Sequence, residues 1–396
     1  MELTGYEKEK YGKQGERQME IRDRRDELLL LVAVSGELPA GWTGAAVGSD
    51  SYAAALVTRL KRDGYLTVRS KDGMKGYLLR ARAKRYLLEV YGGDVAPYLS
   101  GAGATSHVKS EPERRLRLHR MSMVWVFCHR AGVRIFRSDK PELFPAVHHN
   151  PSGSGGEGIP AAYYGTMEWK METDKEIKGS RACGILVSGQ SYVVYNTMDS
   201  LMKWATKTER NLRSRLELRM KRNRNGKLGG AIIMGSQMEM GKRLIMSDGG
   251  VKGTLFRLGD VYESVYYIPL VPEAMVQLWL LCDMEAQYRF HSFLCRALKH
   301  VRGDLSGLEA GTASEGRRIY FCYLFDLWQI RRILGQPFHG GGRVFCFSYQ
   351  AQTLRELLPG TFAIEAIRPD KACRYLGWEN EKEGKQDGGN PNLNRK

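Results

Sequence analysis

LVTRLKRDGYLTVRSKDGMKGYLLRARAKRYL, residues 56–87, combines a high positive charge with the residue spacing of a folded domain. The stretch contains ten Lys or Arg residues and only two acids, Asp63 and Asp72. Its leucines and tyrosines recur at intervals that would bury one face of a helix and then of two short strands. The sequence therefore predicts a small domain whose basic residues face phosphate, rather than a charged surface that faces only water.

The residues around this stretch predict a winged helix-turn-helix. RRDELLLLVAVSG predicts a first helix that Gly36 closes, TGAAVG a short second helix, and SDSYAAALVTRLKRDG a third. Ser49 or Asp50 can cap the third helix, because a short side-chain oxygen accepts a hydrogen bond from an unpaired backbone N–H. Two strands around the turn KDGMKG and a final helix complete the order. In a winged helix the third helix enters the major groove of DNA and the wing lies over the phosphates.

This fold would expose one face of the third helix, the wing and the start of the last helix. Tyr52, Leu56 and Leu60 fall at i, i+4 and i+8 and are expected to face the core. The alternative is a winged helix that contacts proteins and keeps a solvated basic rim. The predicted DNA contacts are Ser51, Thr58, Arg59, Lys61, Arg62, Lys71, Lys75, Arg80 and Arg82.

The composition favours a polyanionic partner. The 61 basic and 44 acidic residues give a formal charge of +17, which fits DNA, RNA or an anionic membrane surface. Double-stranded DNA is the expected partner, and a solvated basic surface without such a partner is the alternative. A homodimer is also open.

Several features indicate a cytoplasmic protein without membrane insertion. No window approaches 18 consecutive apolar residues, and the first residues lack the apolar core of a signal peptide. The seven cysteines are odd in number, widely spaced and without a CxxC pair, as expected of buried free thiols in a reducing compartment. These observations argue against a transmembrane protein.

The length of 396 residues corresponds to about two or three domains. From about residue 161 strand and helix patterns alternate, which indicates a mixed sheet covered on both faces. The expected class is thus α+β to α/β. A winged helix precedes a larger α/β domain with a mixed sheet. In one alternative this sheet is restriction-endonuclease-like. The predicted segments are a disordered charged tail (1–23), the winged helix (24–98), a linker, helix and flexible loop (99–159), the α/β domain (160–376) and a disordered tail (377–396).

A candidate catalytic pair lies in AYYGTMEWKM, which is predicted as a strand. Side chains alternate along a strand, so Glu168 and Lys170 would point to the same side. Such a pair is half of the PD-(D/E)xK nuclease arrangement, in which the acid holds Mg²⁺ or Mn²⁺ and the lysine steadies the attacking water or the phosphate. The upstream acid would be Asp139 or Glu142. A plain Glu–Lys pair is the alternative, and without nuclease activity no cofactor is expected.

A second basic surface is predicted on a long helix within residues 197–224. Nine basic residues lie between Lys207 and Lys227, against two acids. They could follow a nucleic-acid backbone, bind an acidic partner or only face solvent. The residues proposed for this face are Lys207, Arg210, Arg213 and Arg219.

The chain resembles the replication-relaxation family, winged-helix proteins encoded on Gram-positive conjugative plasmids and integrative elements. The resemblance rests on residues 58–87 quoted above, on YYGTMEWK, IKGSRACGILVSGQSYVVYNTMDSLMKW and RVFCFSYQ. It implies DNA binding near an origin, a role in replication or mobilisation, and relaxosome or replication proteins as partners. It also implies a nuclease-like second domain, to which only Glu168 and Lys170 can be carried over.

Three functions follow as hypotheses. The first is a DNA-binding accessory or initiator protein of a mobile genetic element. The second is a metal-dependent PD-(D/E)xK-like DNA nuclease. The third is a winged-helix transcriptional regulator whose second domain senses a ligand or partner, which an enclosed apolar pocket in that domain would favour.

Overall fold

The computed structural model describes most of the chain, in nine segments. The predicted tails fall largely outside the described residues, as do the linker and the glycine-rich loop before residue 161. The described segments are 19–100, 109, 111–143, 161–172, 179–223, 228–298, 309–312, 316–336 and 341–378.

The chain divides into two units. The first contains Met1–His129, Val133–Ser154 and Pro160–Asp174, and the second contains Arg130–Gly132, Gly155–Ile159 and Lys175–Lys396. Residues 162–172, which the sequence prediction placed at the start of the α/β domain, thus belong to the first unit.

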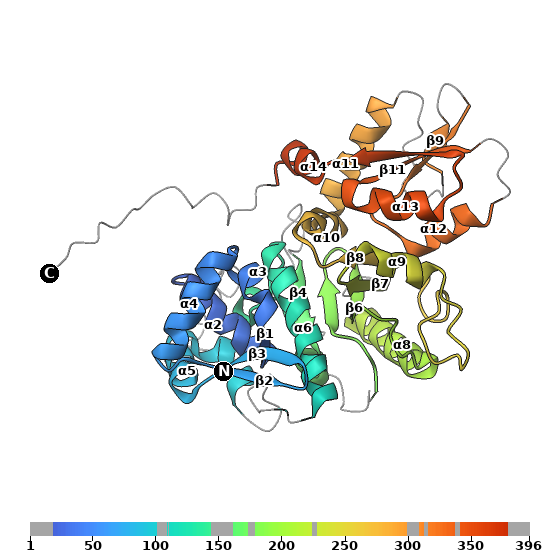
Figure 1. Cartoon of the computed structure of the whole chain (residues 1–396). Helices are drawn as coiled ribbons and strands as arrows, with labels where there is room; N and C mark the ends of the chain where they lie inside the picture. Colours follow the sequence, from blue (N-terminus) through green and yellow to red (C-terminus); the bar gives the residue numbers. More distant parts are fainter. Residues whose placement is uncertain are drawn as a thin grey trace, which may run out of the picture. The chain divides into compact units, whose positions relative to one another are not determined.

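The first unit is a helical region with a small antiparallel sheet (blue to teal in Figure 1). The three strands lie in the order β1-β3-β2, and β3 is antiparallel to both neighbours. The helices follow the order that the sequence predicts, while the short β1 was not predicted. The elements are α2 (Arg24–Ser35), β1 (Leu38–Pro39), α3 (Thr43–Val47), α4 (Asp50–Arg62), β2 (Leu66–Lys71), β3 (Met74–Leu79), α5 (Ala81–Leu99) and α6 (Pro112–Arg130).

Local sequence signals set the ends of these elements. The Ser49 side chain accepts a hydrogen bond from the Tyr52 backbone N–H and so caps α4. Gly36 ends α2 at a φ of 79°, which glycine adopts without steric cost. Asp72 and Gly73, at φ values of 55° and 71°, form a two-residue turn between β2 and β3. Turns with both residues at positive φ fit the twist of paired strands, so this hairpin is short and well defined.

The predicted orientation of α4 was wrong at one residue. The buried side chains of α4 are Ala53, Leu56, Val57 and Leu60, whereas Tyr52 is 46% exposed. Helical geometry puts Tyr52 about a quarter turn from the centre of the buried arc. The tyrosine therefore joins the outer face of the helix and not the core.

The predicted strand near the end of the first unit was wrong in its second half. The stretch AYYGTMEWKM forms β4 (Ala162–Gly165) and then α7 (Thr166–Glu172). The Glu168 carboxylate accepts a hydrogen bond from the backbone N–H of Gly165 at 2.7 Å. A glutamate at the third helical position stabilises a helix start in this way, which accounts for the helix.

The second unit has two mixed sheets interleaved with helices, where the sequence predicted one mixed sheet. In the first, β5 is antiparallel to β6, and β6, β7 and β8 are parallel. In the second, β10, β11 and β12 are parallel and β9 is antiparallel to β10. The strands are β5 (Gly184–Val187), β6 (Ser191–Met198), β7 (Leu228–Gly235), β8 (Val265–Pro269), β9 (Gly311–Thr312), β10 (Arg318–Phe321), β11 (Gly342–Phe347) and β12 (Phe362–Ile367).

The helices of the second unit follow its strands in the manner of parallel sheets. The predicted long basic helix is α8, which buries Leu212, Leu216 and Met220. The helices are α8 (Thr206–Asn223), α9 (Met238–Ile245), α10 (Met275–Cys282), α11 (Met284–Ala297), α12 (Leu327–Leu334), α13 (Ala351–Leu357) and α14 (Pro369–Leu376).

Candidate nucleic-acid interface

The outer face of α4 carries most of the predicted DNA contacts. Ser51, Thr58, Arg59, Lys61 and Arg62 are all exposed, on the side opposite the buried stripe. The Thr58 hydroxyl donates to the Ala54 carbonyl at 2.9 Å, and the Arg62 guanidinium lies 3.3 Å from the carboxylate of Asp63. That ion pair is exposed and therefore weak, so Arg62 can exchange it for a phosphate.

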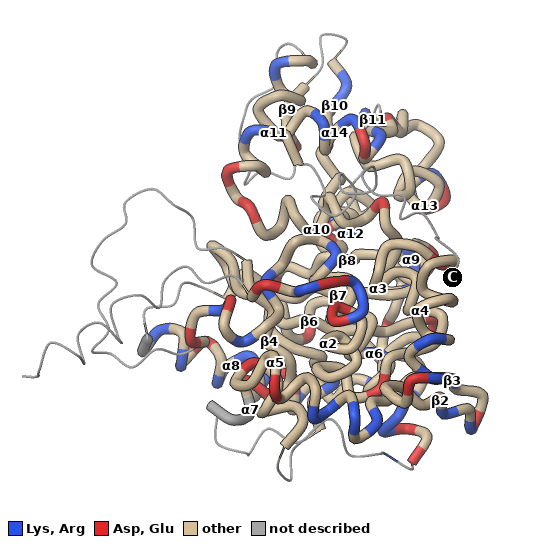
Figure 2. Tube along the Cα trace, turned by 90° about the vertical axis from the view of Figure 1, so that its left-hand side faces the viewer, with Lys and Arg blue, Asp and Glu red and all other residues tan. Residues whose placement is uncertain are grey.

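The β2–β3 turn extends the basic surface. Lys71 and Lys75 are exposed on either side of the Asp72–Gly73 turn. Figure 2 shows basic positions, in blue, on β2 and β3. Arg80 and Arg82 are also exposed, but Arg82 donates to the Asp63 carbonyl at 2.8 Å and lies over the Tyr65 ring.

We call this set the α4–turn surface. It includes Tyr52, which the sequence prediction had assigned to the core. An exposed aromatic ring on a helix that meets DNA offers apolar contact to bases or sugars. The surface consists of Ser51, Tyr52, Thr58, Arg59, Lys61, Arg62, Lys71, Lys75, Arg80 and Arg82.

A buried ion pair holds the backbone of the β2–β3 turn. Arg115 of α6 is fully buried and contacts both carboxylate oxygens of Glu37, at 2.6 and 3.1 Å. The same guanidinium donates to the carbonyls of Lys71 and Met74, at 2.8 and 3.3 Å. His119, one turn later on α6, lies 3.0 Å from the same carboxylate. This network fixes the two residues that flank the turn.

Sequence reasoning missed Glu37, Arg115 and His119. Arg115 and His119 are four residues apart on α6, where apolar residues also recur, so polar residues within an apolar helical pattern were the available signal. Their partner lies 78 and 82 positions earlier in the chain. No local pattern gives such a pairing.

The Glu37 network predicts acid-sensitive stability. Burial alone would raise the pKa of Glu37, but hydrogen bonds from His119 and Arg115 lower it from 4.5 to about 2. Because the folded-state pKa is depressed, the stabilisation is complete above about pH 4.5 and is lost as the pH falls towards 2. We expect this group to remove about 3 kcal/mol from the unfolding free energy over that range.

Urea unfolding of the full chain between these pH values measures the effect. Glu37→Gln should show a flatter dependence on pH than wild type, whereas Glu142→Gln, at an exposed site of the same unit, should not. Parallel pH profiles for wild type and Glu37→Gln would contradict the account.

Glu168 lies in a buried ion pair. Its Oε1 accepts a hydrogen bond from the Lys140 ammonium at 2.5 Å, and its Oε2 accepts the Gly165 N–H. The Lys140 side chain is 1% exposed and also lies over the rings of Trp125 and Tyr164. Burial lowers the pKa of Lys140 although Glu168 opposes that shift.

These contacts give Glu168 a structural role: it pairs with Lys140 and caps the start of α7. The side chain of Lys170 lies outside the described residues, and the strand that was to align it with Glu168 is a helix. Asp139, one of the two candidate upstream acids, accepts a hydrogen bond from the Met19 N–H, and burial raises its pKa. The catalytic pair therefore stays a prediction that no observed contact favours.

Replacing Glu168 by Gln should destabilise the first unit. The variant leaves the buried Lys140 ammonium without a counter-charge, which costs about 3–5 kcal/mol in comparable pairs. Urea unfolding of the full chain measures this change. The double variant Glu168→Gln/Lys140→Met removes both charges and should recover much of the loss; an unchanged stability of Glu168→Gln would contradict the role.

The basic face of α8 is partly neutralised. Lys207 and Arg210 are exposed, while Arg213 and Arg219 are half-buried. Arg213 pairs with Glu217 at 2.8 Å and lies 3.7 Å from Glu263. Since acids already face this arginine, α8 is a weaker candidate for phosphate than the α4–turn surface.

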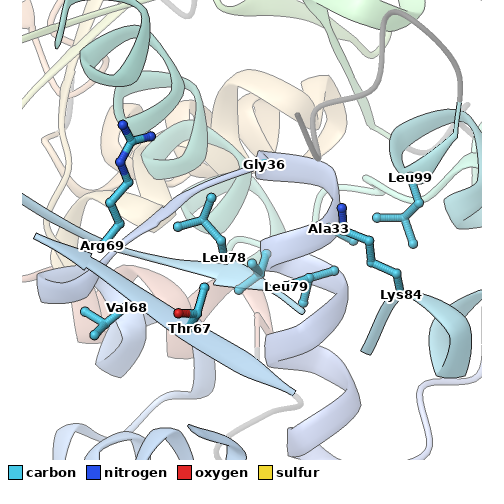
Figure 3. Close-up of a pocket in the computed structure, with 10 residues that line it drawn as sticks. Ala33, Gly36, Thr67, Val68, Arg69, Leu78, Leu79, Lys84 and Leu99 are labelled. Atoms are coloured by element: carbon cyan, nitrogen blue, oxygen red, sulfur yellow. The ribbon is translucent and has the colours of Figure 1, made fainter. Parts of the chain in front are cut away.

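Two hollows among the described residues do not match a ligand-sensing site. A cavity of about 290 Å³ in the first unit lies among Leu78, Leu79, Leu99 and Lys84 (Figure 3). This is near the lower limit of ligand pockets, roughly 300–1,000 Å³. A hollow of about 690 Å³ in the second unit is lined by charged residues, Arg213 and Glu263 among them. Neither is the enclosed apolar pocket that would favour a ligand-sensing regulator.

Other features of the described residues concern metals, membranes and thiols. No three His, Cys, Asp or Glu side chains are grouped there as a metal site requires. No helix in that part of the chain is both long and apolar enough to cross a bilayer. All seven cysteines are free thiols.

Comparisons with known proteins leave the family open. The resemblance to the replication-relaxation family stays a prediction. Neither protein-family models nor curated proteins nor solved structures give a match to this chain.

Proposed function

We propose that the protein binds duplex DNA through the α4–turn surface, and that its first unit acts as a winged helix. The observation that carries the proposal is the segregation of residues on α4. One side of this helix is buried in the core and consists of Ala53, Leu56, Val57 and Leu60. The other side is exposed and ends in three basic residues.

The proposed docking follows from this arrangement. α4 would enter the major groove, with Ser51 and Tyr52 near the bases and Arg59, Lys61 and Arg62 at the phosphates. The β2–β3 turn would place Lys71 and Lys75 over the neighbouring backbone. Support of this turn by Arg115 fits such a role, because a contact to phosphate is effective only when its position is fixed.

The proposed cellular role is narrower and rests on the resemblance alone. It is that of an accessory or initiator protein in the replication or mobilisation of a plasmid or integrative element. Relaxosome or replication proteins would then be partners. The high net charge of +17 is compatible with this role but does not select it.

The nuclease hypothesis is not supported by a specific contact. Both oxygens of Glu168 already accept hydrogen bonds from the protein, so a divalent ion would have to displace Lys140. Supercoiled plasmid with Mg²⁺ or Mn²⁺ tests this alternative. If Glu168→Ala nicks the plasmid as well as wild type does, Glu168 is not the catalytic acid.

Binding of the full chain to a labelled duplex of about 30 base pairs tests the proposal. The affinity should fall by about a thousandfold between roughly 50 and 200 mM salt, because each neutralised phosphate releases counterions. Fluorescence anisotropy measures it. Affinity that is absent at low salt, or that does not change with salt, would refute the proposal.

A further inference from the structure

Exposed apolar side chains gather on two helices of the second unit. Among the described residues nine large hydrophobic side chains are exposed, and four of them lie on α11 and α14. These are Met284, Tyr288 and Phe293 of α11 and Tyr375 of α14. Single exposed apolar residues are ordinary, but a cluster indicates a binding surface.

The aromatic rings of this group lie outside the buried core. α11 buries Phe290 and Leu294, and α14 buries Ala372 and Leu376, in one cluster with side chains of β10 and β11. Tyr288, Phe293 and Tyr375 remain 58%, 38% and 42% exposed. These three rings are therefore accessible to a ligand.

Two basic side chains lie between aromatic ones on this face. At about 100° per residue, Arg289 and Arg296 fall between Tyr288 and Phe293 on the exposed side of α11. The rings of Phe293 and Tyr375 lie 4.1 Å apart, and Arg296 donates to the Tyr375 hydroxyl at 3.5 Å. α11 and α14 thus form one continuous surface.

The charge of this surface is positive. Its exposed basic residues are Arg289 and Arg296 of α11 with Arg368, Lys371 and Arg374 at α14, and its acids are Glu285 and Asp370. Asp370 is paired with Arg374 at 2.9 Å and with Arg368 at 3.5 Å. A polyanion is therefore the complementary ligand.

We propose that this α11–α14 face, composed of Tyr288, Arg289, Phe293, Arg296, Lys371, Arg374 and Tyr375, binds single-stranded nucleic acid. Proteins that bind single strands combine aromatic rings, on which bases stack, with basic residues that follow the backbone. A duplex keeps its bases stacked on one another and would leave the rings unused. The site lies in the second unit and is separate from the α4–turn surface.

The test uses the full chain and a fluorescent oligo(dT) of about 12 nucleotides, within the range of single-strand sites. Phe293→Leu and Tyr375→Leu keep an apolar side chain but remove the ring, so each should weaken binding about fivefold or more. Phe293→Tyr should bind within about twofold of wild type, since it keeps a stacking ring. Arg289→Ala/Arg296→Ala should weaken binding and flatten its salt dependence.

Arg331→Ala, an exposed arginine of α12, is the matched control and should not change the affinity. Thermal unfolding of each variant identifies any that fail to fold. Wild type that binds no oligo(dT), or leucine variants that bind it as well as wild type, would overturn the proposal.

Duplex binding measured in parallel separates this proposal from the first one. Loss of the rings should leave duplex affinity within about twofold of wild type, because a duplex offers no unstacked base. If the protein does not bind duplex DNA but the oligo(dT) results are as expected, the single-strand proposal for the α11–α14 face is retained and the duplex proposal is rejected. Equal weakening of both ligands by the ring variants would contradict a separate single-strand site.

Discussion

Replacing Arg59, Lys61 and Arg62 together by alanine should weaken duplex binding about a hundredfold near physiological salt. These side chains form the basic end of α4, are exposed, and make no buried contact that the fold requires. Loss of three phosphate contacts should also reduce the slope of log affinity against log salt by about three. Fluorescence anisotropy at several salt concentrations measures both quantities.

A charge-matched control separates a local contact from general attraction. Lys203, Lys252 and Arg331 are exposed residues of the second unit, and their triple alanine variant removes the same charge. It should retain the salt slope of wild type within about one. Equal weakening by the two triple variants would show that net charge, and not the α4–turn surface, determines binding.

Arg115→Ala should reduce the unfolding free energy by about 3–5 kcal/mol. The substitution leaves the Glu37 carboxylate, which is 1% exposed, without its main charged partner. It also removes the donor to the carbonyls of Lys71 and Met74. Urea unfolding of the full chain measures the change, and a loss below about 1 kcal/mol would contradict the role of this pair.

A double variant separates stability from the position of the turn. Glu37→Leu/Arg115→Met replaces both charges by apolar groups and should be more stable than Arg115→Ala, since no buried charge is then unpaired. No side chain would hold the carbonyls of Lys71 and Met74, so duplex affinity should stay below wild type. Wild-type affinity in the double variant would show that support of the turn by Arg115 is not needed.

The order of elements in the first unit was predictable because its signals are local. Ser49 caps α4 and Gly36 ends α2 within one turn of the residues they affect. The orientation of α4 was less predictable. Tyr52 fits an i, i+4 pattern with Leu56, and only the packing of α4 against its neighbours shows that Ala53 takes the inner position.

The ion pairs were not predictable because they join distant parts of the chain. Glu168 and Lys140 are 28 residues apart, and Glu37 and Arg115 are 78 apart. The stretch AYYGTMEWKM was predicted to continue as a strand through Glu168. Backbone hydrogen bonding at the start of α7 determined the helix instead.

The pairing of strands in the second unit was likewise not predictable from the sequence. The alternation of strands and helices predicts mixed sheets, and parallel and antiparallel pairs occur in both. The sequence does not say which strands pair, so it predicted one sheet where two are present. The α11–α14 face was missed because Phe293 and Tyr375, 82 positions apart, meet only in the fold.

Hydrogen–deuterium exchange of the full chain, with and without duplex DNA, tests the central claim most directly. Bound duplex should slow amide exchange in residues 50–62 and 69–76, which form α4 and the β2–β3 turn. α8 of the second unit serves as the internal comparison, because it is a basic helix outside the α4–turn surface. The proposed function predicts protection at α4 and the turn; protection at α8 with none at α4 would contradict it.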